Sequence, residues 1–229
     1  MKYTPGIAIG AASGSVGGTT FSRNRYGVYT RTRAIPVNPN TQAQQNARSR
    51  LSTYSALWQS LTAAQRLAWK AWSGQNPITD SLGQQQILSP QVAYVGLNCR
   101  LHMAGDTAID EPPITPAAAG LTSLTGTWDI GAGTFLASFT PTPLAANERL
   151  WCQACVVDSA GISYVANLLR NVSIEAAATA TDVDLENAIE AVFGALQAGQ
   201  TVHIWCSVFD DESGLLSVPM SMQGVVVST

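Results

Sequence analysis

Few side chains in this chain could do acid–base or nucleophilic chemistry, and their spacing matches no common catalytic motif. The chain has two histidines, His102 and His203, and four cysteines. The sequence contains no HExxH, GxSxG, GxxxxGK[ST] or dinucleotide-binding pattern. His203 lies in the apolar run TVHIWCSVF, where a histidine is usually a packed side chain. The sequence therefore predicts a protein that is not an enzyme and that holds no cofactor or metal.

Cys152 and Cys155 form a CxxC pattern, which elsewhere binds a metal or carries a redox disulfide. Here the pattern lies within RLWCQACVVD, a typical strand sequence. Residues three apart in a strand point to opposite faces, so these two thiols cannot share a metal. Cys152 and Cys206 each follow a tryptophan in segments that a β-sandwich can bring together. Both a disulfide between them and two buried free thiols stay open.

Acidic residues cluster at Asp210–Gly214, a segment that could hold a calcium ion. It lacks the alternating carboxylates and the distant glutamate of a calcium-binding loop. We interpret it as the polar tip of a hairpin.

Basic and acidic residues are separated along the chain. Residues 1–105 carry ten of the twelve basic residues and one acid, Asp80, whereas residues 106–229 carry two basic residues and fourteen acids. Such an asymmetry indicates that the halves face each other or face partners of opposite sign. Charged residues make up only 12% of the chain, about half the usual share, which favours a surface partly covered by neighbours.

The basic residues near the N-terminus alternate with aromatic ones. Thr19–Asn24 and Val28–Ile35 are rich in Thr, Tyr, Phe and Val and flank a turn at residues 25–27, which predicts a β-hairpin. In the second strand Tyr29, Arg31 and Arg33 share one face, which is therefore basic and aromatic. The predicted partner-binding residues are those of this hairpin and of the following proline-rich segment: Arg23, Arg25, Tyr26, Tyr29, Arg31, Arg33, Pro36, Asn38, Pro39 and Asn40.

Arginine with few lysines suits bidentate pairing with carboxylates in a protein interface. The same residues, interleaved with aromatic rings, could instead stack on and neutralise a nucleic acid. We favour the protein interface, because no lysine-rich cluster and no known nucleic-acid-binding module occurs.

Helices are expected after the extended segment at residues 36–40. The predicted helices cover residues 42–61, with Asn40 or Thr41 as cap, residues 63–73, capped by Thr62, and about 89–103, where Pro90 suits the first turn. Trp58, Trp69 and Trp72 form either a small helical core or an exposed anchor for a partner. Residues 1–105 thus form an arm, a hairpin and two or three helices, an anchoring domain.

Three prolines within residues 105–118 mark the predicted domain boundary. Beyond it, residues 119–229 predict an antiparallel β-sandwich like those of immunoglobulin or fibronectin domains. A helix is expected within it at Leu185–Leu196. The expected strands cover residues 121–128, 134–140, 149–157, 162–169, 171–177, 201–209 and 215–227. The fold class is α+β in two parts.

The chain shows no apolar leader after Met1 and no run near the ~20 apolar residues of a membrane-spanning helix. Its four scattered cysteines do not suggest a secreted disulfide framework. We expect synthesis in a reducing cytoplasm.

Residues 13–83 contain a series of short motifs: SGSVGG, FSRNRYG, RTRAIPVNPNTQAQ and WQSLTAAQRLAW. In this order they resemble a group of proteins encoded in the structural regions of phages and prophages, with the pattern SGxxGG, FSRNRYG, RxRxxPxNPNTxxQ and WxxLTxxQRxAW. The C-terminal half resembles that group in architecture only. No catalytic residue is implied by the resemblance.

The resemblance implies a virion structural protein, made in the host bacterial cytoplasm. Its partner would be the major capsid protein or another virion protein, with contacts between copies and no membrane. A capsid decoration (cement) protein fits best, and a tail, neck or collar component is the alternative. A nucleic-acid-binding protein that uses the arginine-rich hairpin also stays open, as does a carbohydrate-binding module that uses the sandwich loops.

Overall fold

The computed structural model describes residues 12–24, 27–35, 37–79, 84–131, 135–159, 161–180 and 182–228. The chain forms two compact units, residues 1–46 and 47–229, which we call the N-terminal unit and the main unit. The fold is α+β, and every pairing between its named strands is antiparallel.

Strands of the N-terminal unit form one three-stranded sheet of order β1-β2-β3. The strands are β1 (Gly14–Val16), β2 (Thr19–Asn24) and β3 (Gly27–Thr32). β2 and β3 pair in the register of a hairpin, with Ser22 opposite Tyr29, which confirms the predicted hairpin. β1 was not predicted, and it joins β2 through a turn at Gly17, whose φ of 54° favours glycine.

Three helices follow one another along the chain: α1 (Gln42–Ser60), α2 (Ala63–Gln75) and α3 (Pro90–Ala104). A short hairpin of β4 (Ile78–Thr79) and β5 (Gln85–Gln86) separates α2 from α3. The Thr62 hydroxyl accepts the Gln65 backbone N–H while the Gln65 side chain accepts that of Thr62, a capping box at the start of α2. Ser89 caps α3 before Pro90. The predicted helices and these two caps are confirmed.

Aromatic side chains form the core between these helices. Trp69 is fully buried, its indole N–H donates to the Asp110 carbonyl at 2.8 Å, and its ring packs edge-on against Tyr94 at 5.5 Å. Trp58 and Trp72 pack, partly buried, against the same cluster. The three tryptophans therefore form a helical core and not an exposed anchor.

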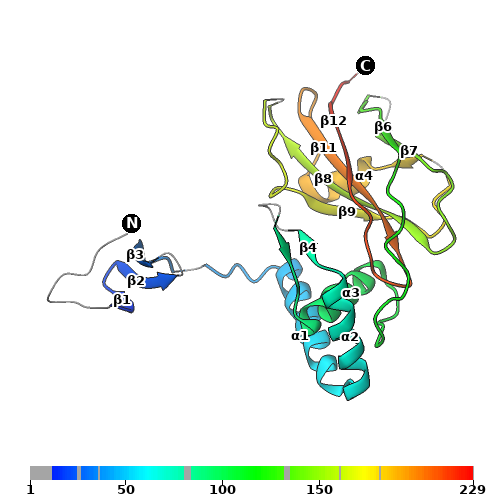
Figure 1. Ribbon diagram of the computed structural model, residues 1–229. Coiled ribbons are helices and arrows are strands. Elements are labelled where there is room, and N and C mark those ends of the chain that lie inside the picture. The colour runs from blue at the N-terminus through cyan, green and yellow to red at the C-terminus, as the bar shows by residue number, and fades with distance from the viewer. Residues whose placement is uncertain are drawn as a thin grey trace. The chain divides into compact units, whose positions relative to one another are not determined.

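Two sheets make up the β-sandwich of the main unit (Figure 1). The three-stranded sheet has the order β10-β7-β6 and the four-stranded sheet the order β12-β11-β8-β9. The strands are β6 (Ser123–Gly126), β7 (Leu136–Thr140), β8 (Glu148–Val157), β9 (Arg170–Ile174), β10 (Val183–Asp184), β11 (Thr201–Asp210) and β12 (Met220–Val225). Helix α4 (Glu186–Phe193) lies where the inserted helix was predicted.

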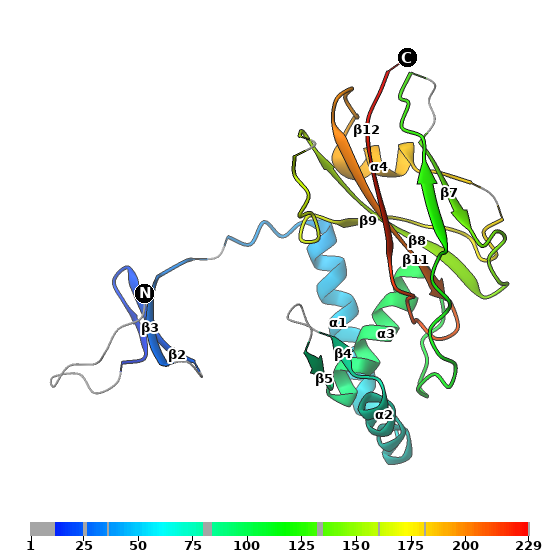
Figure 2. The same cartoon turned by 45° about the horizontal axis from the view of Figure 1, so that its top comes forward.

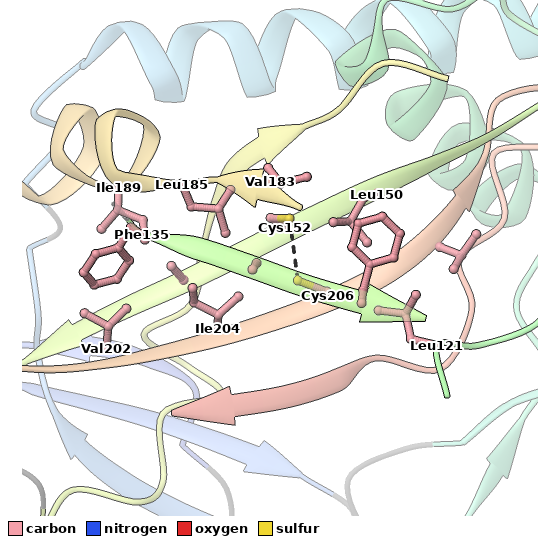
Figure 3. Packing of buried hydrophobic residues seen from close by; sticks show 14 of the residues in the cluster. Leu121, Phe135, Leu150, Cys152, Val183, Leu185, Ile189, Val202, Ile204 and Cys206 are labelled. Carbon is pink, nitrogen blue, oxygen red and sulfur yellow. Dashed lines mark hydrogen bonds between the residues drawn. The ribbon is translucent and has the colours of Figure 1, made fainter. Parts of the chain in front are cut away.

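Apolar side chains from both sheets and from α4 fill the space between the layers (Figure 3). Cys152 and Cys206 are opposite each other on β8 and β11 and fully buried, with their Sγ atoms 3.6 Å apart. The structure has them as two free thiols. The hydrogen bond with the Cys206 thiol, together with burial, raises the pKa of Cys152 well above its ordinary value.

The segment at residues 162–169 was predicted to be a strand, and this prediction is wrong. Its residues are turn and irregular structure, although Val165 is buried against Cys155 and Val157 on the outer face of the four-stranded sheet. A strand that was not predicted, β10, completes the smaller sheet, and its two residues pair with β7. A covering segment and a short strand both contain apolar residues, and the local pattern does not separate them.

Helix α3 packs directly against one end of the sandwich (Figure 2). Leu101 is fully buried against Trp151 of β8 and Phe209 of β11. The turn at Asp210–Gly214 also lies on α3: a Cβ on Gly214, whose φ is +73°, would be 2.9 Å from the Leu97 carbonyl oxygen. This turn, predicted to be a polar hairpin tip, is therefore a buried contact.

Arg149 of β8 also connects the sandwich to the end of α3. The Arg149 guanidinium contacts Asp106 at 2.6 Å and Asp211 at 3.3 Å and donates to the Ala104 carbonyl at 3.1 Å. These contacts help to keep α3 and the sandwich within one compact unit, residues 47–229, across the proline-rich segment at residues 105–118 where the domain boundary was predicted.

Candidate functional site

The N-terminal unit forms a small sheet but has no hydrophobic core among its described residues. Among its described residues, 12–24, 27–35 and 37–46, none is buried. Val16, Ile35 and Val37 expose 74%, 79% and 88% of their surface. A small sheet needs a packed face for stability, so this unit requires another surface to cover it.

The register of the hairpin sets which side chains share a face. Tyr29 lies opposite Ser22 and Arg31 opposite Thr20, whereas Arg23 lies opposite Val28. Because paired residues point to the same side, Tyr29 and Arg31 lie on one face and Arg23 on the other. The predicted arginines are thus divided between the two faces and do not form one basic ribbon.

Arg33 follows β3, and its backbone N–H donates to the Gly18 carbonyl at 2.8 Å, so the chain continues beside the β1–β2 turn. Arg23, Arg31 and Arg33 are exposed. Residues 1–46 contain five basic residues and no Asp or Glu. The unit therefore offers its guanidinium groups no carboxylate partner of its own.

The segment before α1 is exposed at Asn38, Pro39 and Asn40. Asn40 has a positive φ of 51°, and its N–H donates to Asn38 Oδ1 at 3.3 Å. The Asn40 carbonyl accepts from Gln45 Nε2 at 3.2 Å, and the Thr41 hydroxyl accepts from the Gln44 N–H at 3.4 Å. Thr41 is thus the cap of α1, one of the two caps predicted. Arg25, Tyr26 and Pro36 lie outside the described residues.

The backbone adds a second kind of binding group. β1 and β3 are the edge strands of the sheet, so each has a row of backbone N–H and C=O groups on its outer side. Such an edge can accept a further strand from a partner. Sequence reasoning missed β1, although a Gly-Gly turn between Val16 and Thr19 is a recognisable hairpin signal.

The cysteine and histidine that lie closest to a catalytic arrangement are Cys155 and His203, register partners on β8 and β11. Burial raises the pKa of the Cys155 thiol, and 1% of the residue is exposed. A nucleophilic cysteine needs a lowered pKa and access to substrate, so this pair lacks both features. The described residues contain no cluster of His, Cys, Asp and Glu suited to a metal ion.

None of the helices in the described ranges combines the length and the apolar character that crossing a membrane requires.

Comparison with known proteins gives likenesses to solved structures. No protein-family model matches the chain, and no curated protein matches it. Among solved structures the chain is similar to a Fn3-like protein from Clostridium thermocellum, with 12% identity and a TM-score of 0.31. The match covers 50% of this chain and 96% of that protein.

Proposed function

We propose that this chain is a structural protein of a phage virion, whose N-terminal unit docks on another virion protein. We assign its β-sandwich to the immunoglobulin and fibronectin type. The observation that carries the proposal is the N-terminal unit itself: a basic sheet with no buried residue among those described and no acid in its sequence.

A partner surface would supply what this unit lacks. Covering the face that carries Tyr29 and Arg31 would bury the Tyr29 side chain, and carboxylates on the partner would pair with Arg31 and with Arg33, which follows β3. Guanidinium groups suit this role because they bind carboxylates through two parallel hydrogen bonds. The motifs shared with phage-encoded proteins lie in and directly after this unit, which agrees with a role in attachment.

Within the virion, we place the protein on the capsid as a decoration protein that bridges neighbouring subunits. A protein that contacts two neighbouring subunits at once can bind through individually weak contacts, because the second contact forms within the same complex. A tail, neck or collar component would use the same attachment on a different protein.

Cosedimentation with purified particles tests the attachment. We expect full-length protein to sediment with empty capsids, and the double variant Arg31→Glu/Arg33→Glu to lose roughly tenfold or more in affinity, from about 1.5 kcal/mol for each charged hydrogen bond. The single variants Arg31→Glu and Arg33→Glu are compared with Lys70→Glu, which makes the same single charge reversal at an exposed position of α2 in the main unit.

Each outcome separates the alternatives. Retention on tails but not on capsids would keep the virion assignment and exclude decoration. Equal binding by the arginine variants and by Lys70→Glu would exclude the basic face as the anchor. If the protein ignored particles but bound DNA with an affinity that falls steeply with salt, the nucleic-acid hypothesis would replace this one.

A further inference from the structure

A small cavity lies on the outer face of the four-stranded sheet and is lined by residues of the main unit. Alternate residues of β11 point inward, among them Ile204 and Cys206, so their neighbours His203 and Trp205 point outward. On β12, Gln223 pairs with His203 and Ser221 with Trp205, so these four side chains share the outer face.

Two other parts of the chain cover the ends of this face and leave its middle open. Helix α3 covers Trp151 and Phe209 at one end through Leu101. Val165 and Leu169 cover Cys155 and Val157 at the other end. A cavity of about 210 Å³ remains. Its lining residues are Ser163, Val165, His203, Trp205, Ser221, Met222 and Gln223.

One polar atom in this lining has no partner. His203 is 5% exposed, and its Nε2 makes no hydrogen bond within the described part of the chain. A buried polar atom without a partner costs free energy, so native proteins usually satisfy it with water or a ligand. The hydroxyls of Ser163 and Ser221 and the Gln223 amide line the same cavity and can donate and accept.

The charge around the cavity narrows the ligand class. Among the described residues, no Asp, Glu, Lys or Arg lines it. Residues 119–229 contain eleven acidic residues and two basic ones, Arg149 and Arg170. This excess of negative charge disfavours the binding of anions such as nucleotides. An uncharged ligand rich in hydroxyl groups fits the donors and acceptors. Trp205, half-buried, offers a flat apolar ring on which the C–H face of a sugar can lie.

We propose that this cavity is a binding site for a neutral sugar, held by Trp205 from below and by His203, Gln223 and Ser221 at its polar edge. The cavity accommodates a single sugar ring and not a long chain, since drug-sized ligands occupy ~300 Å³ or more. The inference uses none of the residues on which the proposed virion attachment depends, so either can hold without the other.

Titration of the full-length protein with the methyl glycosides of glucose, galactose, mannose and N-acetylglucosamine tests the site. The readout is the set of indole N–H signals in the NMR spectrum, from the six tryptophans of the chain. Trp205→Phe assigns its signal by disappearance. We expect a saturable shift of the Trp205 signal with at least one of the four sugars.

Variants at the exposed edge positions report on the site without disturbing the core. Gln223→Ala and Ser221→Ala should each weaken binding by roughly three- to tenfold, the usual effect of one lost hydrogen bond. Gln153→Ala is the matched control, because Gln153 lies opposite Trp205 on the same face but does not line the cavity. It should bind as the wild type does.

The absence of a saturable shift with all four sugars would overturn the proposal. An equal loss in Gln153→Ala and Gln223→Ala would do the same, since the cavity would then not be the site. Adenosine and uridine are titrated in the same way. A saturable shift of the Trp205 signal with either of them, and none with the four sugars, would show that the cavity binds a nucleobase and not a sugar.

Discussion

Replacing Arg149 by methionine tests whether the helices and the sandwich form one cooperative unit. The Arg149 side chain is 21% exposed and contacts Asp106 and Asp211, which are 14% and 17% exposed. Removing one partner of a buried pair costs about 3–5 kcal/mol, whereas exposed pairs contribute about 0–1 kcal/mol. For this mostly buried triad we expect a loss of about 2–3 kcal/mol in the free energy of unfolding.

The loss should depend on pH in a definite direction. Burial raises the pKa of Asp106, Asp211 raises it further, and Arg149 lowers it. Without Arg149 the folded-state pKa rises more, so the folded protein binds this proton more tightly than the unfolded chain does. The destabilisation is therefore complete above the raised pKa and disappears as the pH falls through it. The difference between variant and wild type should be largest near pH 7 and should shrink toward pH 4.

Urea unfolding followed by circular dichroism measures both effects. Arg170→Met is the matched control, because Arg170 is exposed, with its guanidinium carbon 5.5 Å from the centre of the Phe193 ring. Asp106→Asn in the Arg149→Met background should restore part of the lost stability by removing a buried charge. A loss at Arg149 no larger than that at Arg170, or one independent of pH, would refute the reasoning.

Three further predictions concern other parts of the chain. Gly224→Ala should destabilise the sandwich by about 1–3 kcal/mol, measured as a lower Tm, because its Cβ would overlap the Trp128 indole ring. Cys152 and Cys206 should not react with a thiol reagent in the folded protein and should react on unfolding, since both are fully buried. Removal of residues 1–40, which keeps the cap Thr41 and all of α1, should leave the Tm unchanged within error in calorimetry, because no described residue there is buried. A fall of several degrees would show that those residues stabilise the main unit.

Several elements of this protein follow from local sequence alone. Thr62 with Gln65 and Ser89 with Pro90 begin α2 and α3, because a cap satisfies backbone N–H groups within its own first turn. The β2–β3 hairpin follows from two strand-prone runs that flank a short turn. Each of these signals involves residues a few positions apart, so no knowledge of the rest of the chain is needed.

Other expectations failed where the structure of a segment depends on how it packs against the rest of the folded chain. Residues 162–169 have strand-like composition, yet they cover the outer sheet face through Val165 without pairing as a strand. The acidic turn at Asp210–Gly214 is polar in composition, yet α3 covers it. The turn is covered by α3, which is far away in the sequence, whereas Val165 packs on Cys155 and Val157 of the preceding strand β8.

The candidate sites divide in the same way. The sequence alone placed arginine and tyrosine on the N-terminal hairpin and predicted its partner-binding role, but the strand register put Arg23 on the opposite face from Arg31. The cavity at His203 and Trp205 was not predicted, because it arises where α3 and the segment at residues 161–169 leave the sheet uncovered. Local sequence determines which hydrogen bonds a segment makes with itself. Which of its faces becomes buried depends on the packing of segments that only the tertiary fold brings together.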